Sequence, residues 1–210
     1  MEAKAPVTVG PFARGGKSRL PTVAADHDFH PDATVTPVGL FLPALDERFL
    51  YGMTSKVTRD CLGDCLVRWW DIVHDRFAPI TTLVINLDNG PENHRRRTQC
   101  MRRLVDCAHD SGLTVRLADY PPYHSKYNPI ERCWGILENY WNGALLDSIE
   151  TVIRLATTMT WQGRCPSVEL VTTTHQSGLK LTKDAMKMVD TQRQRFPGLG
   201  KWFACRGSWT

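Results

Sequence analysis

The sequence has no long apolar run, no paired cysteine motif and no strong excess of either charge. No stretch approaches the roughly 18 uninterrupted apolar residues that a membrane span needs, and the start of the chain lacks the apolar segment of a signal peptide. The seven cysteines include no C-x-x-C pair, which argues against a zinc ribbon or a disulfide scaffold. We therefore expect a reduced, cytoplasmic protein with no membrane partner.

What the sequence does contain is an ordinary globular composition. Its 210 residues are 42% hydrophobic and 23% charged, enough for one substantial core. The net charge of +4 permits a polyanionic partner but argues for one only weakly. There is no internal repeat or low-complexity segment, so we expect a single domain with an appendage.

Apolar periodicity predicts a mixed α/β protein. The runs expected to form strands are residues 1–12, 33–42, 48–53, 81–90 and 113–120. The segments expected to form helices are residues 57–77 and 95–111 and a third helix that begins at Pro129 and buries Ile130, Trp134, Leu137, Trp141 and Leu145. This order of strands and helices favours a mixed sheet covered by helices.

Two acidic residues occur where strands and helices meet. Asp88 follows the buried run that ends in "LDNG", at the carboxyl end of a strand, where ligands usually gather in α/β sheets. Glu131 lies in the first turn of the third helix. Each also has a purely structural explanation, since "DNG" forms turns and Asn128 with Glu131 fits a capping box. Because one helix and one strand separate them, adjacent strand ends could bring both carboxylates to the same edge of the sheet.

Such a pair of carboxylates suits a divalent metal. Mg²⁺ prefers carboxylate and phosphate oxygens and does not need a closed cage of protein ligands. Two such ions about 3.5–4 Å apart can activate an attacking oxygen and stabilise the leaving oxygen of a phosphodiester. The helix dipole would keep Glu131 ionised. Glu138, seven residues later on the same helix face, is an additional candidate ligand.

Four longer motifs resemble one family. The segments "INLDNGPENHRRRTQ", "YPPYHSKYNPIERCWG", "MTWQG" and "VGPFARGGKSR" are similar to the bacterial insertion-sequence DDE transposases of the Rhodopirellula type, within the mariner-like DDE group. The resemblance extends through nearly the whole chain. It implies an RNase H-like fold with a mixed five-stranded sheet flanked by helices over residues 1–148, and a mainly helical extension over residues 149–210 packed on that core.

The resemblance also implies a catalytic site. By the family's pattern, Asp88 is the second catalytic carboxylate and Glu131 the third, and together with a first carboxylate they bind Mg²⁺ or Mn²⁺. The implied reaction is hydrolytic nicking at transposon ends, followed by attack of the freed 3′-hydroxyl on target DNA. The implied partners are double-stranded transposon-end and target DNA and further copies of the chain, in a bacterial cytoplasm and on the nucleoid when DNA is bound.

The first carboxylate departs from the family pattern. The family has an Asp just before the "AKA" that precedes the glycine-rich segment, and here that position is Glu2. A Glu can bind metal, but its extra methylene displaces the ion, and errors near 1 Å can cost on the order of a hundredfold in rate. The first half of the first strand and the family's N-terminal DNA-binding region are also missing, so we expect a truncated or decayed copy or a late start.

Basic and aromatic residues near the motifs are candidate DNA contacts. Cationic and flexible residues suit phosphate binding, and aromatic side chains can stack on unpaired bases. The candidates are Arg14, Lys17, Arg19, Arg95, Arg96, Arg97, Tyr123, His124 and Lys126. The alternative for each is an ordinary solvated or packing residue. Two further hypotheses for the whole chain stay open: another RNase H-like nuclease, and a catalytically dead remnant that only binds DNA.

Overall fold

The chain folds into two compact units, each built from separate stretches of sequence. The computed structural model describes residues 1–12, 14–17, 23, 30–31, 33–87, 98–120, 127–175, 181–196 and 199–206. One unit, here called the α3 unit, comprises Glu2–Val57 and Asn128–Thr174. The other, the α2 unit, comprises Met1, Thr58–Tyr127 and His175–Thr210. The predicted mixed α/β class is confirmed, and the predicted division at residue 148 stays a prediction.

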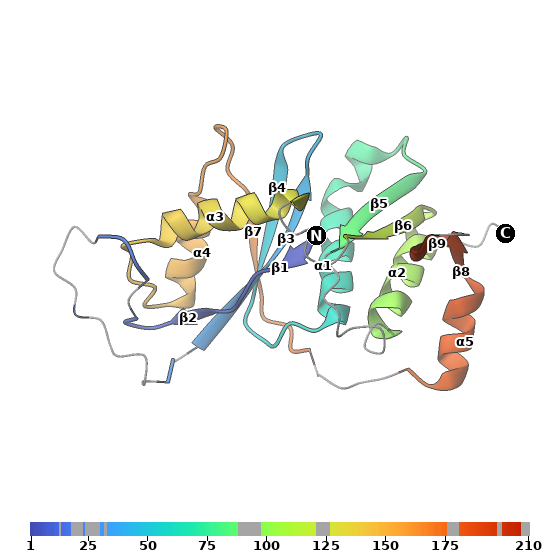
Figure 1. The fold of residues 1–210 in the computed structure, drawn as a ribbon, viewed down its shortest axis with the longest axis horizontal. Helices are drawn as coiled ribbons and strands as arrows, with labels where there is room; N and C mark the ends of the chain where they lie inside the picture. The colour runs from blue at the N-terminus through green and yellow to red at the C-terminus, as the bar shows by residue number, and fades with distance from the viewer. Residues whose placement is uncertain are drawn as a thin grey trace. The chain divides into compact units, whose positions relative to one another are not determined.

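A five-stranded mixed sheet forms the centre of the α3 unit (Figure 1). Its strands are β1 (Glu2–Ala3), β2 (Val7–Val9), β3 (Ala33–Leu42), β4 (Glu47–Met53) and β7 (Ser167–Val171). The expected β3–β4 hairpin is present as an antiparallel pair, and β7 joins β4 in parallel. Both β1 and β2 pair with β3, and this register places Glu2 directly opposite Gly39.

Two helices complete the α3 unit. Helix α3 (Pro129–Trp141) begins where predicted, with Pro129 at the position where a missing N–H costs nothing. It ends before Gly143, whose φ of +72° leaves the helical region. Leu145, predicted to lie on the buried face of this helix, instead follows its end and is exposed. Helix α4 (Ile149–Thr157) is capped by Ser148, whose hydroxyl accepts a hydrogen bond from the backbone N–H of Thr151 at 3.2 Å.

The core of the α3 unit joins strands to helices. Its buried members include Val7, Val35 and Leu50 from the strands, Ile130, Trp134, Leu137 and Trp141 from α3, and Val152 and Ala156 from α4. Glycines in the strands permit close contact: a Cβ on Gly52 would lie 2.5 Å from Cδ1 of Ile153 in α4. The predicted burial of the tryptophans of α3 is confirmed.

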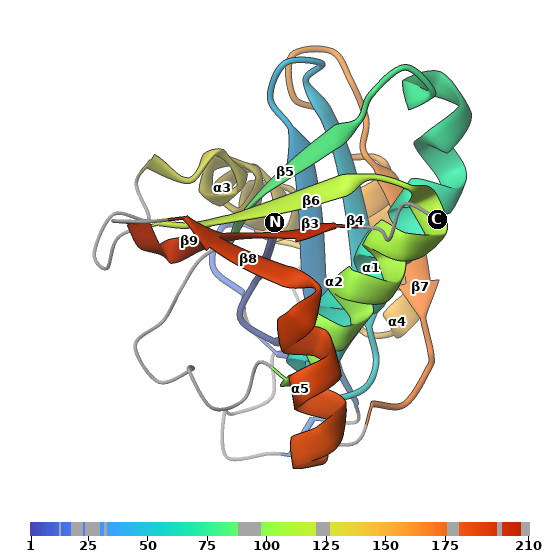
Figure 2. The ribbon, with the colours of Figure 1, turned by 90° about the vertical axis from the view of Figure 1, so that its right-hand side faces the viewer.

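The α2 unit contains a second sheet, with strand order β5-β6-β9-β8 (Figure 2). Its elements are α1 (Arg59–Val73), the 3₁₀ turn η1 (His74–Phe77), β5 (Thr82–Leu87), α2 (Thr98–Ser111), β6 (Thr114–Asp119), α5 (Lys183–Thr191), β8 (Arg193–Phe196) and β9 (Leu199–Arg206). The sequence periodicity predicted β5, α2 and β6 in this order. Strands β5 and β6 pair in parallel, whereas β9 runs antiparallel to both β6 and β8.

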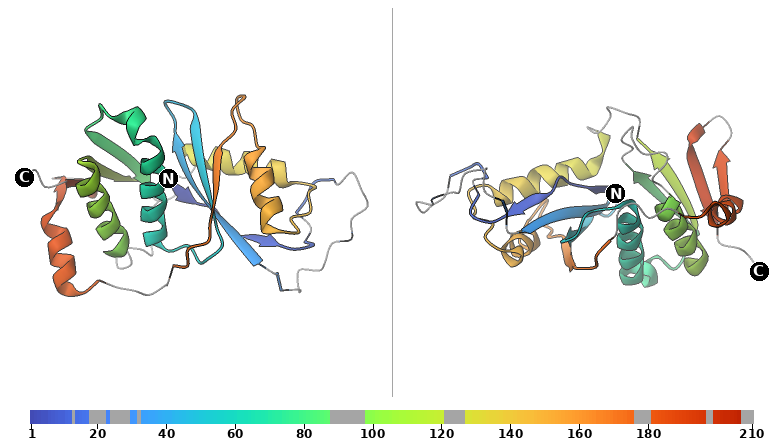
Figure 3. Two further views of the ribbon diagram at one scale, coloured as in Figure 1. Left: turned by 180° about the vertical axis from the view of Figure 1, so that it is seen from behind. Right: turned by 90° about the horizontal axis from the view of Figure 1, so that it is seen from below.

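Helices α1 and α2 lie side by side (Figure 3, left). Their facing sides are buried at Leu66 and Trp69 of α1 and at Leu104 of α2. A polar link adds to this packing: the carboxylate of Asp64 accepts bonds of 2.9 Å from Arg103 of α2 and from His175. His175, the first residue of the C-terminal segment of the α2 unit, is thereby bound to α1.

Two details of the fold differ from expectation. The strands described pair in two sheets rather than in one sheet of five, and β1 is only two residues long, too short to extend a sheet far. Residues 149–210 hold three strands besides α4 and α5, so they are less helical than expected, because "SVELV" and "LGKWFACR" pair with partners remote in sequence. The RNase H-like topology stays a prediction.

Two compositional expectations concern membranes and thiols. Among the described helices, none is long and apolar enough to cross a bilayer. The six cysteines whose side chains are described form no disulfide with one another, and only Cys165 of these six is exposed. Burial raises the pKa of the Cys133 thiol to about 11, so this thiol stays protonated at neutral pH.

Candidate functional site

Two of the three predicted catalytic carboxylates belong to the α3 unit. Glu2 lies on β1, and Glu131 lies in the first turn of α3; both are partly buried. Asp88 follows β5 and lies outside the described residues. Its approach to Glu131, on which the sequence argument depended, therefore stays a prediction.

Asn128 bonds both to the carboxylate of Glu2 and to the backbone of Glu131. Its side-chain Nδ2 donates a hydrogen bond of 2.7 Å to Oε2 of Glu2, and its backbone carbonyl accepts one of 3.1 Å from the N–H of Glu131. Asn128 is only 3% exposed. It occupies the N-cap position of α3, yet its side chain makes no capping bond, so the capping role predicted for it is wrong. The amide is turned toward the strand because the Glu2 carboxylate offers it a charged acceptor.

Gly39 explains how helix and strand come close enough for this bond. It stands opposite Glu2 in the sheet, and a Cβ at this position would lie 2.6 Å from Cη2 of Trp134 and 2.9 Å from Cδ1 of Ile130. Only glycine leaves room for the first turns of α3 at this point. No role was predicted for Gly39 from the sequence, although a lone glycine inside a β-prone run is a known sign of close backbone approach.

The electrostatic setting of Glu131 favours a charged carboxylate. It lies in the first turn of α3, where the helix dipole stabilises negative charge. Within the described part of the chain, no side chain forms an ion pair or hydrogen bond with its carboxylate. Among the described residues, no Lys or Arg side chain pairs with the Glu131 carboxylate.

Glu138 has the opposite setting. Lys4 and Arg14 both form ion pairs with its two carboxylate oxygens, Arg14 at 2.7 Å. The Arg14 guanidinium also lies over the Trp141 ring, 5.3 Å from its centre. Partial burial alone would raise the pKa of Glu138, but the hydrogen bonds from Lys4 and Arg14 outweigh it and hold the pKa below its ordinary value. These contacts support a structural role in place of the metal-ligand role that its helical spacing suggested.

The basic glycine loop is anchored at the end of α3. The N–H of Gly143 donates to the carbonyl of Gly15 at 2.8 Å, and Gly16 has a φ of +75° and too little space for a side chain. Of the DNA contacts predicted in this loop, Lys17 is exposed and Arg14 is held by Glu138. The other predicted contacts lie outside the described residues: Arg19, Arg95, Arg96, Arg97, Tyr123, His124 and Lys126.

The "MTWQG" motif forms a tight turn in the α3 unit. Trp161 and Arg164 exchange two backbone hydrogen bonds of 3.1 Å, with Gln162 and Gly163 at positive φ between them. The Trp161 ring lies 4.2 Å from the guanidinium of the buried Arg48. This motif therefore has a packing role that fixes the turn against the β3–β4 hairpin.

The donors of this site suit a hard divalent cation in part. Glu2 and Glu131 supply carboxylate oxygens, which Mg²⁺ prefers, and the Asn128 amide orients one of them without neutralising its charge. Among the residues described, no group of three His, Cys, Asp or Glu side chains could hold a metal ion. A complete ligand set would need a further carboxylate, and Asp88 is the predicted one.

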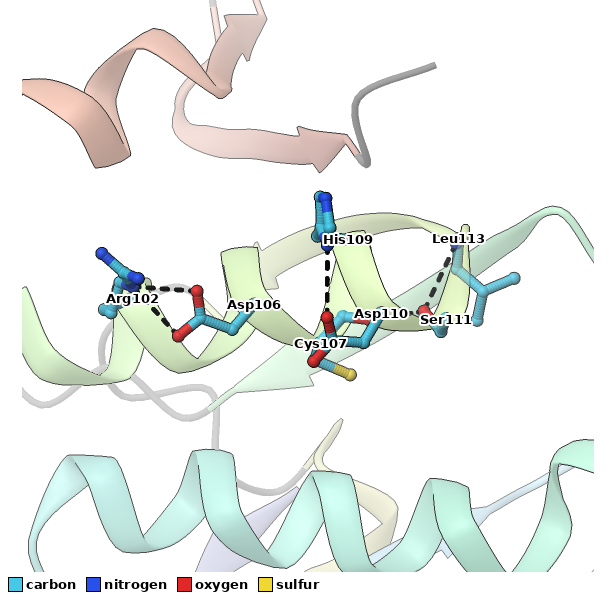
Figure 4. Close-up of polar contacts among 7 residues, drawn as sticks. All are labelled: Arg102, Asp106, Cys107, His109, Asp110, Ser111 and Leu113. Carbon is cyan, nitrogen blue, oxygen red and sulfur yellow. Dashed lines mark hydrogen bonds and ion pairs between the residues drawn. The ribbon is translucent and has the colours of Figure 1, made fainter. Parts of the chain in front are cut away.

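A pocket in the α2 unit is separate from these residues. It has a volume of about 210 Å³ and lies between α2 and α5. Its lining includes Arg102, Asp106 and His109 of α2, Met188 and Val189 of α5, and Gln192, which follows α5. Figure 4 shows that Arg102 and Asp106 pair with each other along α2, and that His109 contacts its neighbour Asp110. Since these charges are satisfied by neighbours on the same helix, the pocket offers no convergent polar groups for chemistry.

Comparison with known proteins gives one match. A family model described as "Rhodopirellula transposase DDE domain" matches residues 1–205. No curated protein matches the chain, and no solved structure matches it. The match covers both units and all four sequence motifs.

Proposed function

Because the chain belongs to the Rhodopirellula transposase DDE domain family, we propose that it cuts DNA strands at the ends of an insertion sequence and joins them to target DNA. In this proposal Asp88, Glu131 and Glu2 are the three catalytic carboxylates. They hold Mg²⁺ or Mn²⁺, which when bound would lower the barrier to attack on a phosphodiester. An RNase H-like arrangement of the strands is part of the same proposal.

One observation supports the proposal most directly. The Asn128 side chain bonds to Glu2 while its backbone bonds to the first turn of α3, which carries Glu131. Asn128 and Glu2 lie 126 positions apart in the sequence, so one buried amide joins β1 to the start of α3. A link of this kind is expected where a carboxylate has to keep a fixed relation to the start of a helix, and a chance surface acid does not need it.

The chain's own residues have distinct roles in this proposal. Glu131 supplies a carboxylate that the helix dipole keeps charged. Glu2 supplies a second carboxylate, oriented by Asn128. Lys17, exposed on a loop anchored to α3, contacts a DNA phosphate, and the other predicted basic and aromatic residues extend that contact. Double-stranded transposon ends and target DNA are the substrates, brought together by several copies of the chain.

The test uses the purified chain, a supercoiled plasmid carrying a candidate transposon end, and Mg²⁺ or Mn²⁺. We expect metal-dependent nicking that is lost in Asp88→Asn and Glu131→Gln and kept in Glu150→Gln, an exposed acidic residue in the first turn of α4. A labelled donor end should also become joined to target DNA. Nicking without joining would indicate a different RNase H-like nuclease, and equal nicking by wild type and both variants would overturn the proposed site.

A second candidate function has one observation in its favour. Residue 2 is Glu, whereas the family pattern that the sequence resembles has Asp, and the longer side chain shifts a bound ion by about one methylene. The chain would then bind DNA without cutting it. Shortening the side chain with Glu2→Asp separates the two candidates: an increase in nicking supports a weakened enzyme, while DNA binding with no nicking by either protein supports a binding-only role.

A further inference from the structure

Asn128 stands at a position where its side chain would ordinarily serve the helix. An Asn at the N-cap usually accepts a bond from a backbone N–H in the first turn, and this contact stabilises the helix. Here the side chain makes no such bond and donates to Oε2 of Glu2 at 2.7 Å instead. Helix α3 therefore lacks a side-chain cap from Asn128, and the carboxylate of Glu2 is held in place by the Asn128 amide.

The surroundings of this bond allow little freedom. Asn128 is buried, its backbone carbonyl accepts the N–H of Glu131, and Pro129 restricts its backbone from the other side. Glu2 is held by pairing with Gly39. The backbone just after β1 is held by a 2.8 Å hydrogen bond from the N–H of Lys4 to the carbonyl of Pro37. Both partners of the Asn128–Glu2 bond therefore have defined backbones.

The chemistry of the bond suits a metal ligand. An amide N–H donor occupies lone-pair space on one oxygen of Glu2 and brings no positive charge of its own, as a Lys or Arg donor would. The same helix shows the alternative at Glu138, which two cations neutralise. Hydrogen-bond partners of this kind set the orientation of metal-binding side chains.

We propose that Asn128 is a positioning residue, which fixes the Glu2 carboxylate relative to Glu131 so that both can bind the same divalent cation site. The proposal rests on the proposed function and extends it to a residue whose side chain bonds to a predicted ligand. Its role is exerted only through the side chain of Glu2.

The test uses two substitutions that separate capping from positioning. Ser and Asp are both good N-cap residues, so Asn128→Ser and Asn128→Asp keep the ability to cap α3. The Ser hydroxyl ends one atom short of the Asn Nδ2 and so lies too far from Glu2 for the 2.7 Å bond, and ionised Asp has no donor and adds a second negative charge. Asn139→Ser, the same change at an exposed position of α3, is the matched control.

Mn²⁺ binding to the purified full chain is measured by isothermal titration calorimetry, with a thermal melt of each variant as the folding check. We expect wild type and Asn139→Ser to bind equally, and Asn128→Ser to bind on the order of tenfold more weakly with an unchanged melting temperature. Asn128→Asp should bind more weakly still. In Glu2→Gln, adding Asn128→Ser should cause no further loss, because the two residues act as a unit.

The outcomes distinguish the two proposals. If wild type binds Mn²⁺ and Asn128→Ser binds it equally well, the positioning role is overturned while the proposed function stands. If wild type binds no Mn²⁺ and nicks no DNA with Mg²⁺ or Mn²⁺, both fail together. Where nicking is measurable, the positioning role also requires that Asn128→Ser lowers kcat and leaves the KM for DNA unchanged.

Discussion

Helix α3 carries two glutamates on one face, Glu131 and Glu138, and their described side-chain partners differ. At the C-terminal end, Glu138 is bound by Lys4 and Arg14, and the arginine is stacked on Trp141. At the N-terminal end, no described side chain pairs with Glu131. At this end of the helix, the neutral side-chain amide of Asn128 donates a hydrogen bond to the carboxylate of Glu2.

The difference shows that the charge of Glu138 is already neutralised by cations of the folded chain. A partly buried negative charge that already has two cations gains little from a metal ion. A charge with only a helix dipole and a neutral neighbour still attracts a cation from solution. Helical spacing alone makes Glu131 and Glu138 equivalent, and only their partners distinguish them.

The largest expected effect comes from removing the charge at the N-terminal end. Glu131→Gln should lower the rate of metal-dependent nicking by on the order of a thousandfold, because a catalytic carboxylate of a cooperating set is lost. The folded state should be retained, since no described ion pair is broken. Plasmid nicking and a thermal melt check both statements, and unchanged nicking would show that the two ends of α3 do not differ in function.

The next largest effect concerns the close approach of α3 to β3. Gly39→Ala places a Cβ against Trp134 and Ile130, and such overpacking typically costs about 1–3 kcal/mol of unfolding free energy. Gly135→Ala is the matched control, because a Cβ there meets no atom within 4 Å and alanine favours a helix. Urea unfolding measures both variants. Equal stability of Gly39→Ala and wild type would contradict the packing described at the N-terminal end.

A smaller effect is expected at the C-terminal end. Glu138→Gln removes the negative charge and one of the two oxygens that bind Lys4 and Arg14, in a partly exposed setting, so the unfolding free energy should fall by about 1–2 kcal/mol. Nicking should change only in proportion to the loss of folded protein. A loss of nicking as large as that of Glu131→Gln, with stability unchanged, would reverse the assignment of the two ends.

The smallest effect is the pH dependence of that same contribution. The pKa of Glu138 is lower in the folded chain than its ordinary value of 4.5, so the unfolded chain binds the proton more readily. The stability difference between wild type and Glu138→Gln should therefore be constant above that value and should decrease as the pH falls through the folded-state pKa. Urea unfolding at several pH values measures it, and a difference that grows in acid would contradict the ion pairs.

Much of the local structure could be predicted from periodicity. The apolar spacing of α1, α2 and α3 predicted their buried faces, and the β-prone runs predicted β3, β4, β5 and β6, because these patterns are properties of neighbouring residues. Strands β7 and β9 were missed, because their partners β4 and β6 lie far away in sequence. Short segments of this kind are stabilised by pairing rather than by intrinsic preference.

The candidate site was only partly predictable for a similar reason. The N-cap pattern identified Asn128, but no local pattern shows that its amide turns toward a strand residue. Spacing placed Glu138 on the correct helix face, but it did not predict the contact with Lys4, just after β1, or with Arg14 of a loop. Asp88 was identified by its place at a strand end and by resemblance, and its convergence with Glu131 stays a prediction.

Binding of Mn²⁺ to wild type, Glu131→Gln and Glu138→Gln, measured by isothermal titration calorimetry, tests the contrast between the two ends of α3 most directly. We expect wild type and Glu138→Gln to bind the ion with similar affinity, and Glu131→Gln to lose this binding while it remains folded. The assignment of the two ends is wrong if binding survives in Glu131→Gln and disappears in a folded Glu138→Gln.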